Sequence, residues 1–134
     1  MARRNEIYAD TSAWIAFLDR SDTYHVVFRR LFSAPPPIVT SALTIAEGHA
    51  WFLRRYDQQR AVQFLRFIDE LGDLEIVAFD AAEISEVRRL VQKYGDQKLT
   101  LADAHGLAIM RERRIRLCWS TDRHLGLTGV QIVI

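Results

Sequence analysis

Cysteine is almost absent from this 134-residue chain, and the single cysteine, Cys118, excludes an intrachain disulfide. Cys118 lies in the largely apolar run 115–119, so a small buried hydrophobic residue is a better interpretation than a nucleophile. No uninterrupted apolar run approaches the roughly 20 residues that a membrane-spanning helix requires. The basic start, 1–4, is followed by no apolar signal-peptide core. We therefore expect a cytoplasmic protein that makes no contact with a membrane.

Lysine is also scarce, because only Lys93 and Lys98 among the 18 basic residues are lysines and the others are arginines. The net charge is only +1, so the chain is not basic overall. Arginine bias fits phosphate recognition, but genome composition produces it just as easily, and we prefer that explanation. If four of the 17 acidic residues share one cleft, however, the remaining surface is net basic.

The chain shows no internal repeat, no low-complexity tract and no linker. Its length suits one domain with a substantial core, and the content of 49% hydrophobic and 26% charged residues is ordinary for a globular protein. We expect a single domain over 1–134.

Apolar spacing and turn residues predict strands that alternate with helices. The predicted strands are 5–10, 38–40, 74–79, 115–120 and 130–134, and the predicted helices are 11–19, 22–32, 41–56, 58–71, 81–94 and 100–113. This alternation favours an α/β layer fold with a mostly parallel central sheet flanked by helices. In such sheets ligands bind beyond the carboxyl ends of the strands.

Four acidic residues are the main functional clue: Asp10, Glu47, Asp103 and Asp122. Asp10 and Asp122 lie at or just past the end of a predicted strand, and the other two lie in the early turns of predicted helices. Carboxylates so far apart in sequence matter together only if the fold gathers them. Gathered carboxylates repel one another unless a hard cation lies between them, and oxygen ligands suit Mg²⁺ or Mn²⁺.

Each acid also has a structural explanation. The pairs Thr100–Asp103 and Thr44–Glu47 have the spacing of capping boxes, in which the acid bonds back to the amide of the capping residue. Asp10 and Asp122 suit plain N-caps or turn residues. Any one of the four acids alone is therefore a weak signal.

The order and flanks of the four acids together form a more specific pattern. Asp-Thr-Ser (10–12) follows a strand, Glu47 lies early in a helix, Leu-Thr-Leu-Ala-Asp-Ala (99–104) opens a late helix, and Ser-Thr-Asp-Arg-His (120–124) follows a late strand. This pattern resembles the PIN-domain ribonucleases, and within them the VapC-like toxins of toxin–antitoxin pairs. The resemblance covers Tyr8 to Val130 and implies a PIN-like three-layer sandwich.

The resemblance implies a site. The metal-binding and catalytic acids are Asp10, Glu47, Asp103 and Asp122. The residues implied to support them are Thr11, Ser12, Thr121 and Asp96. Asp96 also suits a simple loop turn, which we prefer. Leu125 departs from the family, where an aromatic residue is more usual after His124, and this affects packing behind the fourth acid rather than the chemistry.

The function implied by the same resemblance is metal-dependent endoribonuclease activity, with the chain as the toxin of a type II toxin–antitoxin module. One or two Mg²⁺ or Mn²⁺ ions are expected, with Asp10 and Asp103 as direct ligands and Glu47 and Asp122 completing the site partly through water. The implied partners are RNA, an antitoxin protein and a second copy of the chain in a homodimer.

The histidines are poor candidates for a general base. His49, His105 and His124 each lie two residues from an acid, a spacing that puts side chains on nearly opposite faces of a helix. His25 lies at a helix start, where a structural role is a better interpretation than substrate contact. Among the arginines, Arg123 is the preferred phosphate contact because it follows an acid.

Two other functions compete with the nuclease hypothesis. A non-catalytic PIN-like binding scaffold is possible in principle, but it would be free to lose an acid, and the set here is complete. A phosphotransfer domain with Asp10 as phosphoacceptor needs a lysine after a late strand. Only Lys93 and Lys98 are present, and neither follows a predicted strand.

Overall fold

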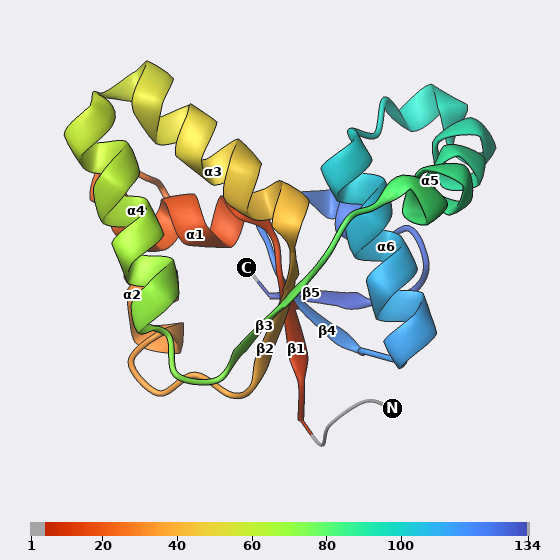
Figure 1. The fold of residues 1–134 in the computed structure, drawn as a ribbon. Helices are drawn as coiled ribbons and strands as arrows, with labels where there is room; N and C mark the ends of the chain where they lie inside the picture. Colours follow the sequence, from red (N-terminus) through yellow and green to blue (C-terminus); the bar gives the residue numbers. More distant parts are fainter. Residues whose placement is uncertain (1–4, 134) are drawn as a thin grey trace.

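A parallel sheet with the strand order β3-β2-β1-β4-β5 lies at the centre of the molecule (Figure 1). The structure is a computed structural model that describes residues 5–133. Its strands are β1 (Ile7–Ala9), β2 (Ile38–Ser41), β3 (Leu74–Val77), β4 (Leu117–Trp119) and β5 (Gln131–Val133). Every neighbouring pair of strands is parallel, which confirms and sharpens the predicted sheet.

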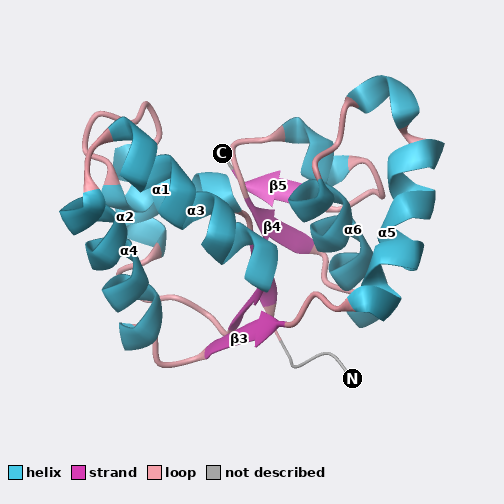
Figure 2. Cartoon of the chain, turned by 45° about the horizontal axis from the view of Figure 1, so that its top comes forward, coloured by secondary structure: helices cyan, strands magenta, loops and turns pink. Residues whose placement is uncertain are grey.

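Helices cover both faces of this sheet (Figure 1, Figure 2). They are α1 (Thr11–Leu18), α2 (His25–Leu31), α3 (Ala42–Arg55), α4 (Gln58–Glu70), α5 (Ala81–Lys93) and α6 (Leu101–Arg113), with 3₁₀ turns η1 (Gly95–Gln97) and η2 (Arg123–Gly126). The first four lie on one face and α5 and α6 on the other, as the three-layer prediction requires. Within 5–133, no helix is long and apolar enough to cross a membrane.

The predicted boundaries differ from the observed ones by a few residues. Helix α2 begins at His25 rather than at residue 22, because Asp22 accepts a hydrogen bond from the Tyr24 N–H and forms a turn there. Strand β4 begins at Leu117 because Arg114, in the left-handed conformation with φ 57°, ends α6 first. Ile134, in the last predicted strand, lies outside the described residues.

The order of the strands creates a switch point between β1 and β4. From β1 the chain steps outward to β2 and β3 through α1–α4, and then α5 and α6 carry it back across the sheet to β4 on the other side of β1. The Asp10 N–H donates to the Trp119 carbonyl at 3.0 Å, so the carboxyl ends of β1 and β4 lie side by side. A ligand site is expected at such a switch point.

Two hydrophobic cores hold the layers together. Between the sheet and α1–α4, Trp14, Phe32 and Trp119 form an aromatic cluster in which ring centroids lie 5.0–5.6 Å apart. On the other face, Leu107 and Met110 of α6 pack against the sheet. Cys118 belongs to this second core and is fully buried, as predicted, and burial raises the pKa of its thiol well above the ordinary value.

Helices α3 and α4 approach each other closely at Gly48. A Cβ atom added there would lie 2.5 Å from Cζ of Phe64, whose ring is buried and stacked on Phe52. We predict that Gly48→Ala lowers the free energy of unfolding, because overpacking costs about 1–3 kcal/mol and exceeds the gain of up to about 1 kcal/mol in helix propensity. Urea denaturation measures this loss. Gly72→Ala, where nothing lies within 4 Å, is the matched control and should leave stability nearly unchanged.

Candidate active site

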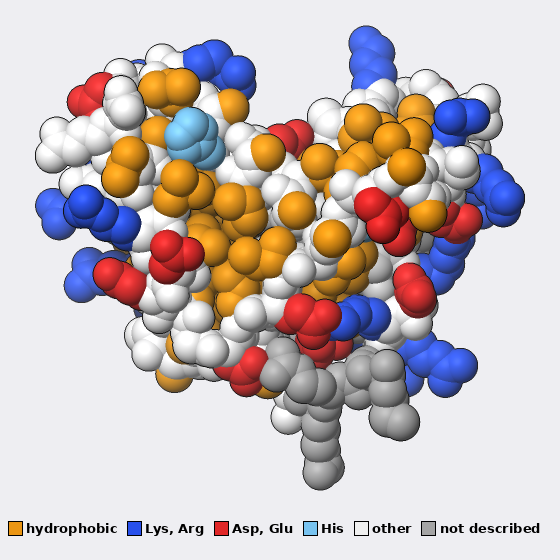
Figure 3. All heavy atoms as spheres, viewed as in Figure 1, with side chains coloured by type: hydrophobic (Ala, Val, Ile, Leu, Met, Phe, Trp, Pro, Cys, Tyr) orange, Lys and Arg blue, Asp and Glu red, His pale blue; other side chains and the backbone are white. Residues whose placement is uncertain are grey.

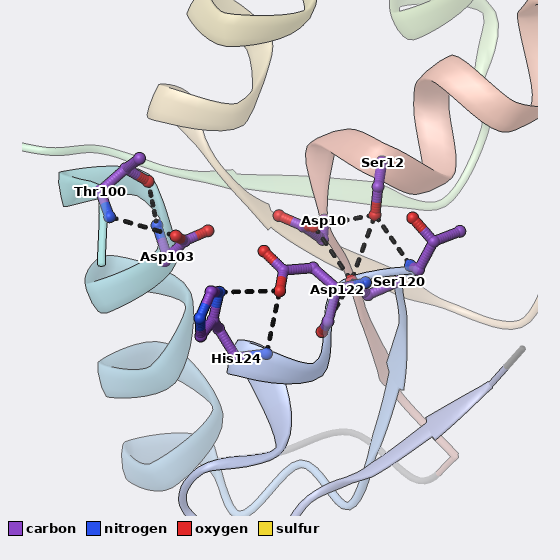
Figure 4. Close-up of polar contacts among 8 residues, drawn as sticks. Asp10, Ser12, Thr100, Asp103, Ser120, Asp122 and His124 are labelled. Carbon is purple, nitrogen blue, oxygen red and sulfur yellow. Dashed lines mark hydrogen bonds and ion pairs between the residues drawn. The ribbon is translucent and has the colours of Figure 1, made fainter. Parts of the chain in front are cut away.

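Asp10 follows β1 at the switch point and is nearly inaccessible to solvent. It is the N-cap of α1, yet its side chain makes no capping hydrogen bond. Instead its Oδ2 accepts hydrogen bonds from the hydroxyls of Ser12 at 2.9 Å and Ser120 at 3.0 Å (Figure 4). Burial raises the pKa of Asp10 to about 6; the Ser12 hydroxyl opposes this shift, and the negative charge of Asp103 adds to it. The Asp10 carboxylate is therefore positioned by two serine hydroxyls and does not cap α1.

The two serines join the turns that follow β1 and β4. Ser12 Oγ accepts the Thr121 N–H at 2.9 Å, and Ser120 Oγ accepts the Asp122 N–H at 2.8 Å. Ser12 and Thr121 were the expected supporting hydroxyls, and Ser120 was not expected. In the structure Thr121 contributes its main-chain N–H to this network, and the buried hydroxyl on Asp10 comes from Ser120.

Glu47 reaches the site from α3. Its Oε1 accepts a hydrogen bond from the Thr11 hydroxyl at 2.8 Å, across 36 residues of sequence. The predicted Thr44–Glu47 capping box is wrong, because α3 begins at Ala42 and Ser41 caps it. Burial raises the pKa of Glu47, against the lowering effect of Thr11, and the charges of Asp103 and Asp122 raise it further.

Asp103 lies in the first turn of α6, where it takes part in a capping box and also faces the other acids of the site. The predicted capping box is present: Asp103 Oδ2 accepts the Thr100 N–H and the Thr100 hydroxyl accepts the Asp103 N–H, both at 3.1 Å (Figure 4). Burial raises the pKa of Asp103, the Thr100 N–H lowers it, and the charge of Asp122 raises it. Capping therefore holds the carboxylate in place but does not remove the electrostatic cost of its neighbours.

Asp122 follows β4 and is paired with a histidine. Its Oδ1 accepts the His124 N–H at 2.9 Å and also lies 2.9 Å from His124 Nδ1. Ligand atoms of Asp103, Asp122 and His124 all lie within 4.8 Å of one another, the spacing of a metal-binding group. The helical spacing argument does not apply to His124, because residues 123–126 form a 3₁₀ turn, and nothing in the sequence therefore indicated that His124 lies beside Asp103 and Asp122.

The structure thus brings the four predicted acids to one edge of the sheet from four separate segments. Asp10 and Glu47 lie outside the tightest group, yet each is close enough to Asp103 for its charge to raise their pKa values. Oxygen donors that repel one another are the donor set expected of a site for Mg²⁺ or Mn²⁺. The residues present therefore fit a divalent metal centre.

A buried contact also sets the distance between the helices that carry Glu47 and Asp103. Ser41 Oγ, at the N-cap of α3, lies 2.6 Å from His105 Nδ1 on α6, and both side chains are buried. His105 packs edge-on against Phe79, and burial lowers the pKa of its imidazole. His105 is therefore a packed residue whose contact with Ser41 supports the helices that carry Glu47 and Asp103.

Three other candidates lie outside this network. Asp96 is exposed in η1, where Gln97 is its only hydrogen-bond partner among the described residues, which agrees with a loop turn. His25 donates from Nδ1 to the Ala16 carbonyl at 2.9 Å and so ties α2 to α1. Arg123 is exposed on η2, beside Asp122 in the chain.

Comparison with known proteins identifies relatives across most of the chain. Ribonuclease VapC26 of Mycobacterium tuberculosis is 30% identical over 115 residues, which cover 85% of this chain and 84% of the relative. The 23S rRNA-specific endonuclease VapC20 of the same organism is 25% identical over 126 residues, covering 92% and 94%.

Solved structures agree with the fold. The crystal structure of Mycobacterium tuberculosis VapC20, a sarcin–ricin loop cleaving toxin, matches with a TM-score of 0.84 at 22% identity over 93% of this chain and 96% of that one. A toxin–antitoxin complex from Klebsiella pneumoniae matches with a TM-score of 0.61 at 20% identity over 96% of each chain. The PIN domain model matches residues 7–129. The chain therefore belongs to the PIN domain family and is similar to the VapC ribonucleases within it.

Proposed function

We propose that residues 1–134 form a single PIN-like domain that hydrolyses RNA phosphodiester bonds with Mg²⁺ or Mn²⁺. The observation that carries this proposal is the convergence of Asp10, Glu47, Asp103 and Asp122 at the switch point, with three of their pKa values raised. A protein retains such mutually repelling charges at one edge when a cation offsets them. The relatives named as ribonucleases support the reaction type.

The metal is proposed to lie among all four carboxylates. Asp10 and Asp103 would hold the ion directly, and Glu47 and Asp122 would complete the site partly through water. When bound, the divalent ion supplies a water of lowered pKa and neutralises the charge that develops on the phosphate. The donor set accommodates one ion, and a second when substrate phosphate contributes oxygens.

The remaining residues of the site orient the acids. Ser12 and Ser120 donate to the same oxygen of Asp10, so they favour its ionised form and fix the plane of its carboxylate. Thr11 does the same for Glu47, and the Thr100 N–H does so for Asp103. His124 holds Oδ1 of Asp122 from one side. The acids are thus positioned before substrate arrives, which removes a cost of reorganisation from the reaction.

RNA is the proposed substrate, and an antitoxin protein and a homodimer are the proposed partners. One relative is named for cleavage of 23S rRNA, and one structural neighbour is a toxin–antitoxin complex. Arg123, exposed next to Asp122, is the proposed phosphate contact nearest to the acids. The competing hypothesis, a non-catalytic PIN-like binding scaffold, does not require four acids that repel one another.

Neutralising a proposed ligand tests the site directly. Asp10→Asn and Asp103→Asn are each expected to reduce RNA cleavage by more than about 100-fold. Removal of a residue that only orients a metal ligand costs up to about 100-fold, and loss of the ligand itself should cost more. Cleavage of a mixed RNA pool by the purified variants, with circular dichroism to verify folding, measures this. Asp69→Asn, at an exposed position on α4, is the control that keeps activity. Full activity in both site variants excludes the assignment.

Metal binding is expected to stabilise the fold by linkage. At a metal concentration 100 times Kd, the gain is about 2.7 kcal/mol, or roughly 10 °C in melting temperature for a chain of this size. Thermal melting with EDTA and then with Mn²⁺ or Mg²⁺ measures the gain, and Asp103→Asn should reduce it. A melting temperature that ignores millimolar metal contradicts the proposal.

Stability without metal is expected to fall as pH rises. The pKa of Asp10, about 6, lies above its ordinary value of 3.8, so the folded state keeps a proton that the unfolded chain has released. Stability contributed by this proton is complete below the unfolded pKa and is lost as pH rises through the folded pKa. Melting in EDTA at about pH 5 and about pH 7.5 measures the slope. Asp10→Asn should flatten it, and an unchanged slope in that variant rules Asp10 out as its source.

A further inference from the structure

A groove runs from the acidic site along one side of α3. It has a volume of about 450 Å³ and lies between α1 and α3, within the range typical of small-ligand sites. The residues that matter for its chemistry are Ile15, Ala46, Glu47, Ala50, Trp51 and Arg54. Figure 3 shows a separate notch between the layer of α1–α4 and the layer of α5 and α6, with an acidic patch at its base; the groove itself lies within the first layer.

The groove is continuous with the acids because Glu47 belongs to both. Glu47 lines the groove, and its Oε1 accepts a hydrogen bond at 2.8 Å from the hydroxyl of Thr11, which follows Asp10 and also lines the groove. Positions 47, 50, 51 and 54 are spaced three and four apart, so they share one face of α3. A substrate strand that leaves the acids in this direction therefore meets the groove residues in order.

The middle of the groove suits a planar, apolar group. The small side chains of Ala46 and Ala50 leave room over α3, and Ile15 faces them from α1. Trp51 is half-buried, and edge-on ring contacts with Phe52 at 4.9 Å and Tyr56 at 6.2 Å hold it in place. Aromatic side chains at fixed positions stack unpaired bases at about 1–3 kcal/mol per base, with little sequence preference.

The far end of the groove carries an exposed cation, Arg54. Arg54 is exposed, and no carboxylate among residues 5–133 lies within ion-pair distance of it. The neighbouring arginine differs, because Arg55 lies over the Tyr56 ring at 5.2 Å. Glu47 and Arg54 are seven residues apart, or about 10 Å along the helix, so Arg54 is placed to contact a phosphate beyond the scissile one.

We propose that this groove is a subsite for single-stranded RNA next to the scissile bond, where Trp51 stacks an unpaired base and Arg54 binds a phosphate further along the strand. The proposal rests on the proposed nuclease function and adds a binding direction and a requirement for an unpaired nucleotide. RNA is favoured over a protein segment because the groove joins the proposed phosphodiester-cleaving site to a cation that has no ion-pair partner in the described part of the chain.

Arg54 is tested through salt dependence. Each phosphate contact to a single strand contributes a slope of about 0.7 in a plot of log affinity against log salt. Arg54→Ala is expected to lower that slope by this amount, Arg54→Lys to restore it, and Arg66→Ala, at an exposed position on α4, to leave it unchanged. Fluorescence anisotropy with a labelled single-stranded RNA measures the slope, in an Asp10→Asn background with Mn²⁺ so that no cleavage occurs.

Trp51 is tested with a substrate that lacks one base. The wild-type cut site in a defined single-stranded RNA is mapped, and an abasic nucleotide is then placed at each position near it. On intact RNA, Trp51→Ala should lower kcat/KM by about 5- to 150-fold. At one abasic position the wild type and Trp51→Ala should cleave equally, because the base that stacks is missing. Leu53→Ala, exposed on the same helix, is the control that behaves as wild type.

The outcomes separate this proposal from the nuclease assignment. If the wild type cleaves no RNA, the proposed function fails, and anisotropy still decides whether the groove binds RNA. The subsite proposal is overturned if the wild type cleaves RNA, Arg54→Ala has the salt slope of the wild type, and Trp51→Ala has its kcat/KM. A protein partner would then be the better occupant of the groove. Arg54 is exposed, so its variant remains informative even if Trp51→Ala fails to fold.

Discussion

Repulsion among carboxylates confined to one edge of a sheet is the constraint on which this structure depends. Burial of Asp10, Glu47 and Asp103 raises the pKa of each, and the charge of a neighbouring acid adds to it in every case. The fold opposes this cost locally with hydrogen bonds from serine and threonine, and the proposed metal ion would offset the remainder. The acidic site therefore lowers the free energy of unfolding, and the protein keeps it for its function.

The scaffold around the acids is built to resist that repulsion. Two hydrophobic cores fix the sheet from both faces, and the order of the strands brings the ends of β1 and β4 together. The serine network then joins the two turns, and the Ser41–His105 contact sets α3 against α6. The positions of Asp10 and Asp122 are thus coupled through Ser12 and Ser120, and those of Glu47 and Asp103 through the helices that carry them.

The sequence predicted the architecture well because periodicity and turn residues are local signals. Asp10 and Asp122 were placed after strands, and the rule for parallel sheets then predicted their proximity. Ser120 and His124 were missed for different reasons. The motif Ser-Thr-Asp does not reveal which hydroxyl turns inward, and the role of His124 depends on a 3₁₀ turn where a helical spacing argument does not apply. The bond from Thr11 to Glu47 joins distant segments, so only the fold reveals it.

The switch-point topology also affects when the chain acquires its chemistry. The acids lie at positions 10, 47, 103 and 122, and the central strand β1 completes its pairing only when β4 docks beside it. Contacts this distant in sequence form late, because chain entropy must be lost before they contribute. A nascent polypeptide that has not yet released β4 from the ribosome therefore lacks the fourth acid and the Ser120 hydroxyl. The proposed nuclease activity is therefore confined to chains in which β4 has already docked beside β1.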